Sequence, residues 1–150
     1  MSLKLVYFKM RALAEAPQML MRCNDIKYDY VMSWIYFGEP WAKAKPKLNF
    51  KQLPMLEVSG QHQICQSIAI LKFLEDKAGL RIADPVEAAK ADAILQSSQE
   101  LFAPLNPTVN FAVGDDFLAK RDAMRPALST RFQELQDCLE ENSFKFFTDD

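Results

Sequence analysis

The chain has 150 residues, of which 49% are hydrophobic and 25% charged, an ordinary globular composition with room for one domain or a small domain with a helical companion. Its formal net charge of −2 provides no basic excess that would favour nucleic acid or an anionic membrane surface. No apolar run is long enough to span a bilayer, and the first residues lack the basic and apolar segments of a signal peptide.

Short strands and a helix alternate at the start of the chain. β-Branched and aromatic residues predict a strand over 3–8, and apolar residues at helical spacing predict a helix from about Ala14 to Cys23. Alternation predicts a second strand over 28–33. Because a helix connects these strands, we expect them to be parallel. Residues 34–50 contain glycine and prolines among lysines, and are expected to be irregular with at most short helical turns.

A hairpin and a helix follow. Strands are predicted over 55–58 and 61–65, joined by a turn at Ser59-Gly60. A helix marked by apolar residues from Ile68 to Ala78 should end at Gly79, a favourable C-terminal cap. The elements up to this point predict an α/β unit with a mixed sheet.

Beyond residue 80 the pattern is helical throughout. Asp84-Pro85-Val86-Glu87 marks a helix start, with the aspartate as N-cap and the proline in the first helical position. This helix is predicted to run to about Ala103, where Pro104 and Pro107 interrupt it. Asp115 starts another helix, which Pro126 either kinks or divides. Its later part carries an amphipathic apolar stripe of Leu128, Phe132, Leu135 and Leu139.

The change of pattern predicts two domains, residues 1–79 and 85–150, with a linker over 79–84. Three cysteines, odd in number and far apart, suit a reducing cytosol rather than a disulfide framework, so we expect a cytoplasmic protein. The one histidine, His62, has no partners at ligand spacing, so no metal site is expected. Cys23 lies late in its helix, which disfavours a thioredoxin-like redox role.

Four passages share their order and spacing with one enzyme family: Lys4–Glu15, Trp41–Lys45, Phe50–Glu57 and Gln66–Leu74. Through them the chain resembles the cytosolic glutathione transferases of the sigma class over residues 3–80, and more weakly over the later helices. The resemblance implies a thioredoxin-like N-terminal domain and an incomplete all-α C-terminal domain.

The resemblance implies that Tyr7 is the catalytic residue. The thiol of glutathione, the co-substrate, reacts as a thiolate, and a hydroxyl that donates a hydrogen bond to sulfur lowers the thiol's pKa. Tyr7 matches the donor at the end of the first strand, and Phe8 and Leu13 match glutathione-binding residues beside it. From the residues alone, Tyr7 is also compatible with an aromatic packed in the core.

The resemblance also implies which residues hold the tripeptide. Gln66 and Ser67 start a helix, where backbone N–H groups and the helix dipole favour the γ-glutamyl carboxylate. Pro54 would be cis and would present the backbone of Leu53 to the cysteinyl part. From the residues alone, Ser67 also fits a plain helix cap, Pro54 a trans proline, and Lys45 a solvated charge in a lysine-rich segment. The glycyl end would be held by Trp41 and Lys45, and Gln52, just before Leu53, would be a further glutathione-binding residue.

Three regions depart from the sigma pattern: the loop after the first strand, the region of Glu100 and the C-terminal passage. Leu13 replaces the second arginine of that class; the mu class also has leucine there, with a backbone group assisting instead. Ala12 replaces a glycine and should disfavour positive φ. Glu100 corresponds to a carboxylate that reaches glutathione across a dimer. The passage Phe144–Asp150 resembles the loop before the family's central buried helix, so we expect a fragment, or an apolar stripe that a partner chain covers.

The implied activity is attack of the glutathione thiolate on an electrophilic small molecule by a homodimeric enzyme. The electrophile pocket is expected around Phe8, Met10 and the helical region 102–111, whose aromatic residues also fit a core. Two alternatives stay open. One is a glutathione-dependent isomerase, and the other is a non-catalytic glutathione-binding or structural protein resembling the S-crystallins.

Overall fold

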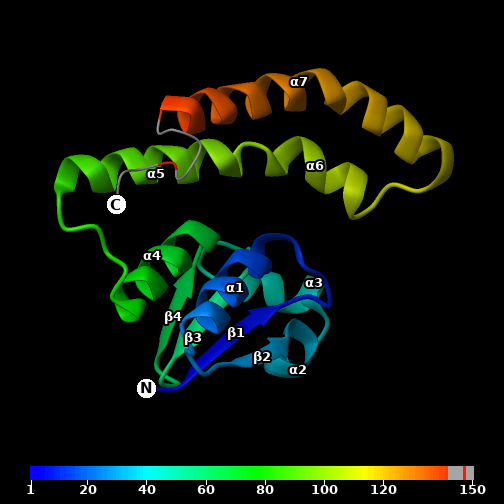
Figure 1. Cartoon of the computed structure of the whole chain (residues 1–150). Coiled ribbons are helices and arrows are strands. Elements are labelled where there is room, and N and C mark those ends of the chain that lie inside the picture. The colour runs from blue at the N-terminus through cyan, green and yellow to red at the C-terminus, as the bar shows by residue number, and fades with distance from the viewer. Residues whose placement is uncertain (142–146, 148–150) are drawn as a thin grey trace. The chain divides into compact units, whose positions relative to one another are not determined.

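The computed structural model of the chain describes residues 1–141 and Phe147. Two compact units divide the chain, Met1–Arg81 and Ile82–Asp150 (Figure 1). The elements of the first unit alternate between strands and helices; in chain order they are β1 (Leu3–Tyr7), η1 (Ala12–Ala14), α1 (Glu15–Cys23), β2 (Asp29–Met32), α2 (Ser33–Phe37), α3 (Trp41–Ala44), η2 (Lys45–Lys47), β3 (Met55–Val58), β4 (His62–Cys65) and α4 (Ser67–Ala78).

The first unit is built on a four-stranded mixed sheet with strand order β2-β1-β3-β4. β1 and β2 are parallel, whereas β3 is antiparallel to both β1 and β4. The sequence predictions of a crossover pair and a hairpin are confirmed. Sheet and helices together form the thioredoxin-like α/β unit that the sequence predicts.

Helices α1 and α4 pack against each other and cover one face of the sheet (Figure 1). Leu5 of β1 and Leu56 of β3 are register partners, and both are completely buried. Met21 of α1 and Ile70 and Leu74 of α4 complete this core with no exposed surface. Such dense burial gives the sheet a rigid scaffold on which a site can be positioned.

Residue 79 ends α4 as the sequence predicts. Gly79 adopts a left-handed φ of 71°, and its N–H and that of Leu80 bond back to carbonyls of the last helical turn. The segment over 34–50, predicted to be irregular, contains the short helices α2, α3 and η2.

The second unit contains three helices among its described residues: α5 (Pro85–Gln99), α6 (Phe102–Val109) and α7 (Gly114–Glu141). Asp84 caps α5 as predicted, because its carboxylate accepts from the N–H groups of Val86 and Glu87 at 2.8 and 3.0 Å. Arg131 of α7 forms an ion pair with Glu100 at the end of α5. The carboxylate expected to reach glutathione across a dimer is therefore engaged within its own chain.

Pro104 and Pro107 do not interrupt the helices as predicted, and Pro126 does not divide α7. α5 ends at Gln99, before the predicted interruption, and Pro104 and Pro107 both lie inside α6. Pro104 occupies the first turn, where a backbone N–H has no helical partner to lose. α7 continues through Pro126 without a second start.

The apolar stripe on α7 is only partly covered. Leu128 is 9% exposed, whereas Phe132 is 55% exposed. Leu135 and Leu139 are half-buried. Apart from Phe147, the passage 144–150 lies outside the described residues. None of the described helices combines the length and apolar character needed to cross a membrane.

Candidate functional site

Three strands have neighbouring ends at one side of the sheet, where β1 and β4 end and β3 begins. This side is called the edge below. Val6 of β1 pairs with Met55 of β3, and Met55 pairs in turn with Cys65 of β4. One residue beyond this row stand Tyr7, Pro54 and Gln66. Because neighbouring strands lie about 4.8 Å apart, the backbones of the outer two positions are separated by roughly 10 Å. The register therefore brings three separate motifs of the sequence to the same edge.

Tyr7 ends β1 at this edge and is only 4% exposed. Burial raises the pKa of its phenol, and a hydrogen bond from the backbone of Leu13 opposes that effect. With a raised pKa, the phenol stays protonated at neutral pH. The bond from Leu13 uses a lone pair of the phenol oxygen, so the hydroxyl proton remains available for another acceptor. This tyrosine is therefore a buried O–H donor.

The loop after Tyr7 makes the Leu13 hydrogen bond possible. Ala12 lies in the left-handed region with φ of +48°. The expectation that alanine would disfavour a positive φ at this position is therefore wrong, although glycine adopts this conformation more easily. Leu13 follows in η1, which leads directly into α1. The side chain at position 13 plays no part in the bond, because the backbone supplies it.

An aromatic cluster joins this loop to α3. The rings of Phe8 and Trp41 meet edge to face, with centroids 5.5 Å apart and an interplanar angle of 82°. Phe37 of α2 lies on the other side, with its centroid 6.4 Å from that of Trp41. Such pairs favour one fixed ring geometry. The structure thus places the predicted Trp41 next to the residue that follows Tyr7.

The lysines of this segment are not equivalent. Lys47 pairs with Glu39 at 2.6 Å, so its ammonium group is already engaged. Lys45 is exposed, and its backbone N–H bonds to the carbonyl of Trp41 one turn earlier. No ion pair to the Lys45 ammonium occurs among residues 1–141. This arrangement distinguishes between two lysines that the sequence left interchangeable.

The second group of predicted residues lies where β3 begins and α4 starts. The Leu53–Pro54 peptide bond is cis, as predicted. The amide Nε2 of Gln66 donates to Oε1 of Gln52 at 3.1 Å, which joins two predicted residues from different loops. Ser67 opens α4 and is 8% exposed.

Gln66 itself has an unusual backbone, with φ of 76° and ψ of 122°. A non-glycine residue keeps such a conformation only where its surroundings hold it, and these positions concentrate at binding sites. Its carbonyl accepts the N–H of Ile70 at 3.0 Å, which closes the first turn of α4. Gln66 therefore lies directly beside the backbone N–H groups of the first turn of α4.

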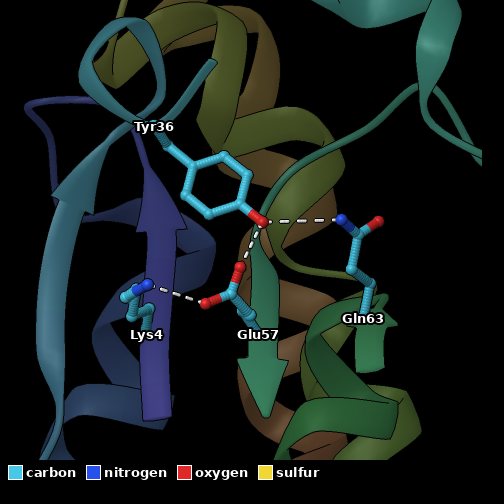
Figure 2. A network of polar contacts seen from close by, with 4 residues as sticks. All are labelled: Lys4, Tyr36, Glu57 and Gln63. Atoms are coloured by element: carbon cyan, nitrogen blue, oxygen red, sulfur yellow. Dashed lines mark hydrogen bonds and ion pairs between the residues drawn. The ribbon is translucent and has the colours of Figure 1, made fainter. Parts of the chain in front are cut away.

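A polar network that the sequence did not predict links α2 to the sheet (Figure 2). Lys4, Glu57 and Gln63 form a row across β1, β3 and β4, because they are register partners. Glu57 accepts from the Lys4 ammonium at 2.9 Å and from the Tyr36 hydroxyl of α2 at 2.5 Å. Gln63 lies 3.5 Å from the same hydroxyl. Strand register would have revealed the Lys4–Glu57 pair, whereas the contact with α2 needed the tertiary structure.

This network fixes the charge of Glu57. Hydrogen bonds from Tyr36 and Lys4 hold the pKa of its carboxyl below the ordinary value. Burial and the neighbouring carboxylate raise the pKa of Tyr36. The network therefore fastens α2, whose last residue Phe37 contacts Trp41, to the centre of the sheet.

Within residues 1–141 and Phe147, no group of three or more His, Cys, Asp or Glu side chains is placed to hold a metal ion. The predicted residues around Tyr7, Trp41 and Gln66 instead offer hydroxyl, indole and amide groups. These groups can donate and accept hydrogen bonds.

Comparison with known proteins decides the family. Residues 1–76 match the glutathione S-transferase N-terminal domain family. The chain belongs to the glutathione S-transferase family. Over 148 residues it is 32% identical to the probable glutathione S-transferase 6 of Caenorhabditis elegans, spanning 96% of this chain and 70% of that protein.

Two further relatives extend the comparison. The hematopoietic prostaglandin D synthase of Gallus gallus is 41% identical over 95 residues, which cover 63% of this chain and 45% of that one. A monomeric glutathione S-transferase of Necator americanus has a similar solved structure, with a TM-score of 0.75, 28% identity, and coverage of 94% of this chain and 69% of that one. Glutathione is the co-substrate of this family.

Proposed function

We propose that this protein binds glutathione along the edge formed by Tyr7, Pro54 and Gln66 and transfers it to electrophilic small molecules. The observation that carries the proposal is the strand register, which sets these positions side by side. An extended tripeptide spans roughly 10 Å, which matches the width of three adjacent strands.

Tyr7 activates the thiol in this proposal. The buried hydroxyl donates a hydrogen bond to sulfur and thereby favours the thiolate, which attacks the electrophile. The Leu13 backbone bond strengthens the donor, because it stabilises negative charge on the phenol oxygen. Leu13 in place of the sigma-class arginine is therefore compatible with catalysis.

The two ends of glutathione would be held by different groups. The γ-glutamyl carboxylate binds Gln66, Ser67 and the N-terminus of α4, where open N–H groups favour an anion. The backbone of Leu53 pairs with the cysteinyl part like a neighbouring strand. The glycyl carboxylate lies toward Lys45, with the Trp41 indole beside it.

A glutathione-dependent isomerase is a second candidate, and the similarity to the Gallus gallus prostaglandin D synthase favours it. The same thiolate would serve both reactions. Conjugation consumes glutathione, whereas isomerisation returns it, so measuring residual glutathione after turnover separates the two activities.

Replacing Tyr7 with phenylalanine tests the proposal. We expect conjugation of glutathione to chlorodinitrobenzene to fall roughly 10- to 100-fold in kcat/KM, because a hydrogen bond to a charged group is lost. Retention on immobilised glutathione should persist, since the other contacts remain. Steady-state kinetics and resin binding provide the measurements.

Tyr28→Phe provides the control, because it removes a hydroxyl that bonds Gln18 of α1 instead of facing the edge. A wild-type protein that binds glutathione but does not conjugate it would contradict the transferase activity and leave the isomerase and the non-catalytic protein as alternatives. A wild-type protein that does neither would refute the proposed site.

We also propose that the protein forms a homodimer, as the family resemblance implies. The Necator americanus relative is described as monomeric, so the family contains both states. Sedimentation velocity measures the state directly. A single species at the monomer mass across micromolar concentrations would refute the dimer.

A further inference from the structure

Tyr30 of β2 reaches the loop that follows Tyr7. It pairs in register with Leu5, and its hydroxyl donates to the carbonyl oxygen of Phe8 at 2.6 Å. The carbonyl oxygen of Met10 lies 3.4 Å from the same hydroxyl. A side chain of the neighbouring strand thus contacts two backbone groups of one short loop.

This loop has few other backbone hydrogen bonds, although its apolar side chains pack against the core. The N–H of Met10 bonds to the carbonyl of Phe8 at 2.8 Å, and that of Ala14 bonds to the carbonyl of Arg11 at 3.4 Å. Ala12, with its left-handed φ of +48°, lies within the turn that the Arg11–Ala14 bond closes. A strained residue keeps its conformation only where the surroundings over-determine it. An external anchor at Phe8 therefore matters for the path of the loop.

We propose that Tyr30 is a positioning residue that holds the Phe8–Leu13 loop so that the Leu13 backbone stays bonded to the Tyr7 hydroxyl. This inference rests on the proposed function, because it assigns a consequence for the thiolate that Tyr7 stabilises. Tyr30 touches neither the sulfur nor the reacting atoms, and acts through the loop alone.

The chemistry of Tyr30 suits a permanent donor. Burial, with smaller contributions from Tyr7, Glu15 and Tyr28, raises the pKa of its phenol to about 12. The hydroxyl therefore remains protonated over the whole range in which a thiol ionises. The Phe8 ring adds a second restraint through its edge-to-face contact with Trp41. The anchored loop consequently connects the predicted thiol-activating and glycyl-binding residues.

The test compares Tyr30→Phe with Tyr28→Phe in the full chain. Both variants lose one phenolic oxygen close to β2, but Tyr28 bonds the side chain of Gln18 at 3.3 Å, not the loop. Amide hydrogen exchange over residues 9–13 reports the anchor directly. We expect Tyr30→Phe to speed exchange in this loop about fivefold, the effect of one lost hydrogen bond, and Tyr28→Phe to leave it unchanged.

The pH profile of kcat/KM then separates positioning from a general structural role. Tyr30→Phe should raise the kinetic pKa of the glutathione thiol by about half a unit, because the Tyr7 donor is less well held. Unchanged loop exchange would overturn the anchor. Faster exchange with an unshifted profile would overturn its link to the thiolate while leaving the proposed function intact. If the wild type does not conjugate glutathione, the proposed function fails, and the exchange data still decide the anchor.

Discussion

Tyr7 shows how two local effects set the chemistry of one side chain. Burial favours its neutral form, and the Leu13 backbone bond favours charge on its oxygen. Because burial is the larger effect, the phenol keeps its proton and can donate it to a hydrogen bond. The same residues explain a limit of sequence reasoning. Tyr7 and an assisting backbone group near Leu13 could be expected only from the family resemblance, because a backbone group leaves no trace in residue type.

Ala12 is a second case at the scale of one residue. Its left-handed φ costs an alanine about 1 kcal/mol, which glycine avoids. We predict that Ala12→Gly raises the free energy of unfolding by about 0.5 kcal/mol, after allowing for the greater freedom of glycine in the unfolded chain. Urea-induced unfolding measures this change. Ala16→Gly, at an exposed helical position of α1, should instead lower stability; equal effects at both positions would contradict the account.

The two neighbouring lysines give a prediction about binding. Lys45→Gln should weaken glutathione affinity about fivefold, because one partner of the glycyl carboxylate is lost. Lys47→Gln should leave affinity nearly unchanged, since that ammonium pairs with Glu39. Isothermal titration calorimetry compares the variants. Equal losses would show that the segment attracts glutathione through general charge alone.

At the scale of elements, the network around Glu57 fastens α2 to the sheet (Figure 2). The carboxyl has a pKa below its ordinary value, so its charged form stabilises the fold. That contribution is present above the ordinary pKa and is lost as the pH falls through the lower, folded value. Acid should therefore loosen the connection between the sheet and the helix that precedes Trp41.

Glu57→Gln tests this link. We predict that the variant is less stable than the wild type at pH 7, and that the difference shrinks below about pH 4.5 as the wild-type carboxyl becomes protonated. Urea midpoints measured across this range provide the comparison. A stability difference that stays constant with pH would show that packing, and not the charge of Glu57, holds α2.

Sequence pattern predicted elements better where local chemistry decided them. The Asp84 cap and the Gly79 stop are set by neighbouring residues, and both appear as predicted. The effect of the prolines in α6 and α7 was harder to predict, because proline disfavours a helix locally whereas packing between helices can keep a helix that contains one. The short helices of residues 34–50 agree with the expectation of at most short helical turns, although the sequence did not give their bounds.

At the scale of the whole molecule, the candidate site depends on strand register rather than on any single motif. The sequence supplied Tyr7, Pro54 and Gln66 as separate candidates, and the pairing of Val6, Met55 and Cys65 places them in one row. Tyr30 could not be recognised beforehand, since its strand position shows only an aromatic residue on a sheet face. Its function emerges from a contact with the loop, which only the folded chain contains.

The most direct test of the central claim is the ionisation of the bound glutathione thiol. Ultraviolet difference spectroscopy follows thiolate formation as the pH of the protein–glutathione complex is raised. The account predicts that the thiol ionises at least about one pH unit lower on the wild type than in free glutathione, and close to the free value on Tyr7→Phe, which still binds. Identical ionisation on both proteins would contradict the assignment of Tyr7 as the donor to sulfur.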